Sequence, residues 1–79
     1  MDKKKDERIL KLKQKAEKLR EEVDFLRAEK DEALLRMSLN ELFHVEGQRL
    51  DGQATRLFVA KLHLDEVITS LEVAEEFDV

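Results

Sequence analysis

The chain has 79 residues, of which 43% are charged and 42% hydrophobic, with a formal net charge of −4 and no proline, cysteine, tryptophan or tyrosine. A chain of this length buries only about 60% of the surface that its unfolded form exposes, so one domain is the limit and a deep enzyme pocket is not expected. Without cysteine, neither disulfides nor thiolate zinc sites can reinforce a thin core, which leaves oligomerisation as the remaining means of stabilisation.

A long helix is predicted over residues 4–45. Apolar residues recur there every seven positions in two rows, and the residues between them are mostly good helix formers. The first row consists of Ile9, Ala16, Val23, Lys30 and Met37, and the second consists of Leu12, Leu19, Leu26, Ala33 and Asn40. Two rows with this spacing form the stripe, or seam, by which one helix packs against another.

The pattern changes after Met37, where Leu39, Leu42 and Phe43 fall out of phase with both rows. The run from Ser38 to Glu41 fits a capping box, in which a serine at the start of a helix and a glutamate three residues later satisfy each other's backbone amides. Two interpretations stay open: the first helix breaks near Ser38, or it continues with a wider apolar face near the turn.

A turn is predicted over residues 46–52, because both glycines of the chain fall there. A second helix is predicted over residues 53–77, with a start near Gln48 as an equal alternative. Its rows are Leu50, Leu57, Leu64 and Leu71, and Gln53, Ala60, Val67 and Ala74. Residues 1–79 are therefore expected to form one all-α domain, a two-helix coiled-coil hairpin that assembles into an oligomeric helical bundle.

The two predicted helices differ in length, and the difference leads to the functional prediction. If the chain folds back near residue 49, the second helix reaches only to about residue 20, and the apolar stripe before it stays uncovered. We therefore expect a non-enzymatic protein-protein interaction module, such as an adaptor, scaffold, chaperone or inhibitor, that binds a second copy of itself and another protein. The predicted partner-binding residues are Ile9, Leu12, Ala16, Leu19, Val23, Leu26, Leu57, Leu64, Val67 and Leu71.

The alternative function is a small nucleic-acid-binding regulator that uses a basic N-terminal arm, because residues 1–20 carry nine Lys and Arg against four Asp and Glu. A basic segment before a leucine heptad resembles a basic-region leucine zipper. That family's Asn-x-x-Ala-x-x-(Ser/Cys)-Arg pattern is absent, however, and Ile9, Leu12 and Leu19 already belong to the seam. Protein binding is therefore the preferred prediction.

No catalytic, metal or cofactor site is predicted. The pairs Glu41-x-x-His44 and His63-x-x-Glu66 are similar to the ligand motif of di-iron bundles, but the bridging glutamates that such a site needs are not at inward positions. No apolar run approaches the roughly 20 residues of a membrane span, and no apolar segment follows the basic N-terminal residues. We expect a soluble, cytoplasmic protein without a signal peptide or a membrane partner.

Overall fold

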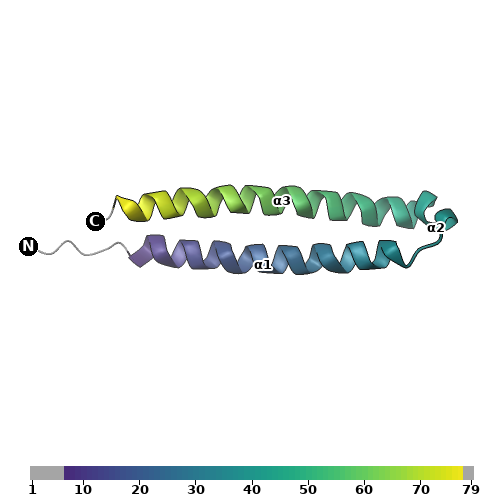
Figure 1. Ribbon diagram of the computed structural model, residues 1–79, viewed down its shortest axis with the longest axis horizontal. Coiled ribbons are helices and arrows are strands. Elements are labelled where there is room, and N and C mark those ends of the chain that lie inside the picture. The colour runs from purple at the N-terminus through teal and green to yellow at the C-terminus, as the bar shows by residue number, and fades with distance from the viewer. Residues whose placement is uncertain (1–6, 78–79) are drawn as a thin grey trace, which may run out of the picture.

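The computed structural model describes residues 7–77, and within this range the chain is α-helical and contains no strand. The predicted all-α class is confirmed. The helices are α1 (Glu7–Leu35), α2 (Leu39–Phe43) and α3 (Val45–Glu76). Helices α1 and α3 run side by side in opposite directions, and the short α2 lies at the end where the chain turns (Figure 1). Since α3 has 32 residues with a rise of about 1.5 Å each, the molecule is a rod about 48 Å long and two helices wide.

The chain reverses direction over residues 36–44, where local hydrogen bonds define the turn. The amide of Met37 donates to the carbonyl of Leu34 at 3.1 Å and closes the end of α1. Ser38 then caps α2: its hydroxyl accepts from the amide of Glu41 at 3.3 Å, and the Glu41 carboxylate accepts from the amide of Ser38 at 3.2 Å. Together these two bonds form a capping box, which starts a new helix immediately after the old one.

The turn predicted over residues 46–52 is wrong, because both glycines lie inside α3. Gly47 is buried where the backbone of α2 crosses α3. A Cβ at this position would lie 2.5 Å from the carbonyl oxygen of Glu41 and 2.6 Å from Cα of Leu42. Gly47 therefore permits a close approach of two backbones, which is a different use of glycine from a turn.

The helix boundaries change accordingly. The predicted alternative of a break near Ser38 is confirmed, because the first helix ends at Leu35 and not at residue 45. The long second helix starts at Val45, earlier than either predicted start, residue 53 or near Gln48. The predicted start near residue 4 lies outside the described residues. Since α1 and α3 contain 29 and 32 residues, neither extends far beyond the other.

The predicted N-terminal overhang is also wrong. Lys13 Nζ lies 2.9 Å from Glu75 Oε1, so the early part of α1 is covered by the end of α3. The physical reason is the position of the turn: a chain that reverses near residue 40 brings its last helix alongside the whole of α1.

The core of the helix pair is thin. Among the described residues, the apolar side chains that are buried are those of Ala16, Leu50, Ala54 and Ile68. Two helices can shield only the narrow strip between them. Most of the remaining apolar side chains are therefore left partly exposed to solvent.

Candidate functional site

The four apolar rows read from the sequence take two different positions in the structure. The rows that begin at Ile9 and Leu50 lie between α1 and α3, where their members are buried or half-buried. We call these two rows the inner rows. The rows that begin at Leu12 and Gln53 lie to one side of the contact. Each of their residues comes three positions after a residue of an inner row, and so points in a different direction around the helix axis.

Charged residues with long side chains complete the contact between the helices. Lys13, Arg20 and Arg27 of α1 occupy the positions next to the inner row and reach toward α3, and Lys61 of α3 reaches toward α1. Their aliphatic parts cover apolar surface while their charged ends meet acidic groups. The sequence analysis did not assign these residues to the contact, although their regular seven-residue spacing was a usable signal.

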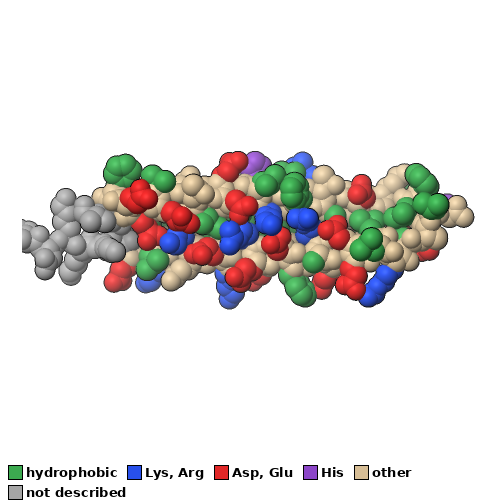
Figure 2. Space-filling view, viewed as in Figure 1, with side chains coloured by type: hydrophobic (Ala, Val, Ile, Leu, Met, Phe, Trp, Pro, Cys, Tyr) green, Lys and Arg blue, Asp and Glu red, His purple; other side chains and the backbone are tan. Residues whose placement is uncertain are grey.

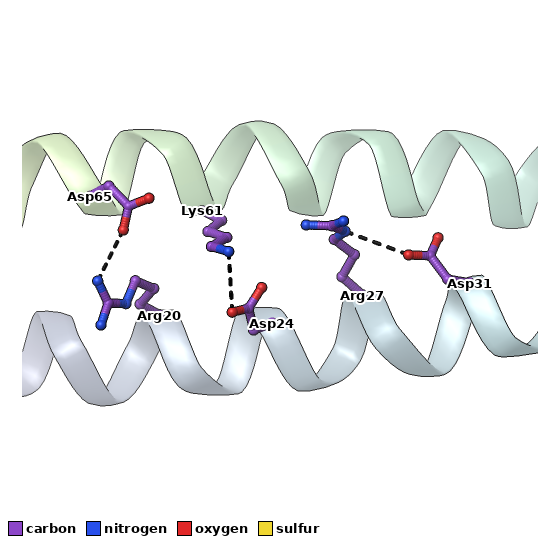
Figure 3. Close-up of polar contacts among 6 residues, drawn as sticks. All are labelled: Arg20, Asp24, Arg27, Asp31, Lys61 and Asp65. Atoms are coloured by element: carbon purple, nitrogen blue, oxygen red, sulfur yellow. Dashed lines mark hydrogen bonds and ion pairs between the residues drawn. The ribbon is translucent and has the colours of Figure 1, made fainter.

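One lateral face of the helix pair carries a line of ion pairs, drawn in Figure 3. Arg20 Nη1 lies 3.1 Å from Asp65 Oδ1, and Lys61 Nζ lies 3.4 Å from Asp24 Oδ2. The guanidinium carbon of Arg27 lies 4.8 Å from the centre of the Phe58 ring. Side chains of both signs follow the line between the helices on this face (Figure 2). We call it the charged face.

The opposite lateral face is apolar, and it is the candidate functional surface. In an antiparallel pair, equivalent flanking positions of the two helices lie next to each other, so the rows beginning at Leu12 and Gln53 share one side. We call this side the leucine face; it consists of Leu12, Leu19, Leu26 and Ala33 of α1 and Gln53, Ala60, Val67 and Ala74 of α3.

The large side chains of the leucine face are strongly exposed. Leu12 is 53%, Leu19 48%, Leu26 45% and Val67 45% exposed to solvent. Single exposed leucines are ordinary, but a continuous row of them along a helical rod is typical of a surface that binds another molecule.

An open groove of about 710 Å³ lies on the leucine face near the turn end of the molecule. Leu26 and Lys30 of α1 and Gln53, Arg56 and Leu57 of α3 line it. The Oε1 atom of Gln53 is shielded from solvent and has no hydrogen-bond partner among residues 7–77. A shielded carbonyl oxygen without a partner is costly, which marks this position as incomplete in a single chain.

A second apolar patch lies at the turn end, around α2. Leu35, Leu39, Phe43 and Val45 are 73–86% exposed there. The sequence analysis took Leu39 and Phe43 as part of a broader buried face or as a sign of a break, and it did not predict an exposed tip. The sequence signal was their phase shift relative to both apolar rows.

The predicted partner-binding residues therefore fall into two groups. Those of the inner rows cover the other helix of the same chain, and they are Ile9, Ala16, Val23, Leu57, Leu64 and Leu71. Those on the leucine face are open to solvent, and they are Leu12, Leu19, Leu26 and Val67. The single seam expected from the sequence is thus divided between an intrachain contact and a free surface.

Hydrogen bonds shift the pKa values of Glu41, Glu46 and Lys13. The bond from the Ser38 amide, followed by the bond from its hydroxyl, lowers the pKa of Glu41. The bond from Arg49 lowers the pKa of Glu46, and the bond to Glu75 raises the pKa of Lys13. All three act in the turn or along the helix contact, so they stabilise structure and do not mark a reactive centre.

Within residues 7–77, no three His, Cys, Asp or Glu side chains gather closely enough to hold a metal ion. His44 lies at the junction of α2 and α3, whereas His63 lies in the middle of α3. In the same range, no helix has both the length and the apolar content that crossing a membrane requires.

Comparison of the chain with protein-family models, with curated proteins and with solved structures found no match.

Proposed function

We propose that this chain is a non-enzymatic protein-protein interaction module, a coiled-coil adaptor, scaffold, chaperone or inhibitor that oligomerises and docks its partner through the leucine face. The observation that carries the proposal is the row of half-exposed leucines, Leu12, Leu19 and Leu26, beside a core of only four buried apolar residues among those described. Covering these leucines would stabilise the molecule, because burying the exposed half of each side chain contributes about 0.7–1.5 kcal/mol.

The charges of α1 favour this proposal over the nucleic-acid alternative. Lys13 and Arg20 belong to the basic N-terminal segment, but they bind Glu75 and Asp65 of α3. These cations are thus largely neutralised within the chain, which weakens the attraction of this segment for a phosphate backbone. A binding surface that is apolar in its centre and charged at its edges is typical of protein contacts.

The proposal is tested by polar substitution on the leucine face. Light scattering coupled to size exclusion, at tens of micromolar, should give the native chain at least twice its mass of 9.3 kDa. Leu12→Gln with Leu19→Gln should shift the mass toward one chain while circular dichroism still shows helices, because Gln keeps the helical preference and removes the apolar contact.

The matched control is Lys11→Gln with Lys18→Gln, which introduces the same residue at the neighbouring exposed positions of α1. This variant should keep the native mass. A native chain that is a stable, helical monomer at these concentrations, or a leucine variant with unchanged mass, would contradict the proposal.

A further inference from the structure

We infer that the occupant of the leucine face is a second copy of this chain, packed so that the two turn ends lie at the same end of a four-helix bundle. The inference rests on the proposed function and specifies its partner and geometry. Four properties of the leucine face support it: its size, the alternation of large and small residues, the charges at its edges, and the unpaired amide of Gln53.

The size of the face is suitable for a stable contact. The leucine face follows most of the helix pair, which is about 48 Å long and 14 Å wide. A face of these dimensions is on the order of 670 Å², within the roughly 600–1,000 Å² that each partner contributes to a standard protein interface. A second helix pair of the same length would cover it completely.

The alternation of large and small residues follows from the helix register. Because Arg20 lies opposite Asp65 and Asp24 opposite Lys61, Leu19 lies at the level of Val67 and Leu26 at the level of Ala60. With the turn ends together, a two-fold axis along the rod places α1 of one copy on α3 of the other at the same levels. Each leucine then packs on a smaller residue, as Leu26 does on Ala60 of the second copy.

The opposite orientation, with the turn ends apart, packs these side chains less evenly. It places α1 on α1 and α3 on α3, so that Leu19 meets Leu26 of the second copy on one side of the bundle. On the other side, Ala60 meets Val67 of the second copy. One side is then crowded and the other underfilled, and uneven packing of this kind is unfavourable.

The charges at the edges of the leucine face also favour the turn ends lying together. Glu29 and Arg56 are exposed on the outer edges of this face, Glu29 on α1 and Arg56 on α3, at the same level of the rod. In one chain they lie on opposite edges. When α1 packs on α3 of the second copy, Glu29 meets Arg56 of that copy, and the two-fold axis produces the pair twice. With the turn ends apart, Glu29 would meet Lys15 of the second copy, which is also an attractive pair, but Glu22 would meet its own equivalent, which is a repulsive one.

Gln53 provides the fourth argument. Its Oε1 atom is shielded and unpaired, and its side chain lines the groove on the leucine face. With the turn ends together, the Gln53 side chains of both copies lie at the same level across the axis. Rotation of each side-chain amide about its last bond then brings its oxygen within reach of the amide of the other copy. With the turn ends apart, Gln53 would face the apolar Ala74. A single buried amide pair of this kind is a known way to fix the orientation of a helical bundle.

The first experiment measures the distance between the two turn ends. Asn40→Cys in α2 gives one attachment point for a spin label, because the chain has no other cysteine. Pulsed electron paramagnetic resonance should then give an intermolecular distance of about 30 Å or less, since packed helices lie about 10 Å apart. A distance of about 50 Å, close to the full length of the rod, would overturn the inference and leave the proposed function intact.

The second experiment exchanges the charges at the edges. Glu29→Arg alone and Arg56→Glu alone should each weaken self-association by about fivefold, because each replaces two attractive exposed pairs with repulsive ones. The double variant should restore the native affinity. This rescue requires contact between copies, because the two residues lie on opposite edges of one chain. Absence of rescue would count against the inference.

These experiments distinguish failure of the proposed function from failure of the proposed orientation. A monomeric native chain shows no intermolecular coupling and contradicts both the proposed function and this inference. A mass above two copies, or a two-copy mass with only the long distance, contradicts this inference alone.

Discussion

The inner rows and the leucine face are built from the same residue types at the same seven-residue spacing, yet they have different surroundings. Leu64 and Leu71 lie between α1 and α3, whereas Leu12 and Leu19 are about half exposed. The difference comes from the partners that a helix pair can offer. Two helices cover one strip of each other, so a second apolar strip stays open until another molecule covers it. A heptad pattern therefore shows which apolar rows of a helix can be buried. It does not show whether a row is covered by a helix of the same chain or by another molecule.

The largest expected effect on stability comes from a substitution in an inner row, and it distinguishes the inner rows from the leucine face. Leu64→Asp places a carboxylate between the helices without a partner, which should cost several kcal/mol and remove most of the helical circular dichroism signal. Leu12→Gln with Leu19→Gln should instead change the mass and retain the helices. If Leu64→Asp kept the native melting temperature, the assignment of Leu64 to an inner row would be wrong.

A smaller effect is expected at the turn, which aligns the inner rows but does not belong to the leucine face. Gly47→Ala introduces a Cβ 2.5 Å from the carbonyl oxygen of Glu41, so α2 must move, at a cost of about 1–3 kcal/mol. Chemical denaturation measures this change.

Gly52→Ala is the matched control for the turn. A Cβ at Gly52 meets nothing within 4 Å, and alanine is the better helix former, so this variant should gain about 0.5–1 kcal/mol. Equal effects of the two alanines would show that α2 does not pack on Gly47.

The smallest expected effect is a pH dependence of the turn. The bond from the Ser38 amide lowers the pKa of Glu41 in the folded chain, so its carboxylate stabilises the fold above the pKa of the unfolded state. That contribution is lost as the pH falls through the lowered pKa.

The measurement compares the native chain with Glu41→Gln. The difference between their free energies of unfolding should be constant near pH 7 and should shrink as the pH falls below the usual titration range of glutamate. Glu21→Gln, a substitution of an exposed glutamate in α1 that has no role in the contacts described above, is the control. A difference that stays constant down to acidic pH would show that the Glu41 carboxylate does not cap α2.

The helical class of the fold could be predicted from the sequence because it depends on local properties. The absence of proline, the heptad spacing and the helix-forming residues between the rows all act over a few turns of one helix. The capping box at Ser38 is equally local, and its sequence signature was visible. In the structure it starts α2.

The position of the turn and the division of the surface depend on contacts between distant residues. Gly47 looked like a turn residue, but the structure uses it where the backbone of α2 comes close. Lys13 and Arg20 looked like a solvated basic face, and they are held at the helix contact by Glu75 and Asp65 of α3. Neither arrangement can be read from a single helix, and both determine which apolar row remains exposed.

The turn has one more consequence, which concerns how the two helices are held lengthwise. A slide of α3 by seven residues, about 10 Å, would place Glu72 opposite Arg20 and Asp65 opposite Arg27, so cations would again meet anions. Lys61 would likewise exchange Asp24 for Asp31. The charges along the rod thus tolerate two alignments one heptad apart. The alignment in the structure is fixed at its turn end by the capping box of Ser38 and the close packing at Gly47. The contacts along α1 and α3 would also allow an alignment shifted by seven residues, so the turn determines which of the two forms.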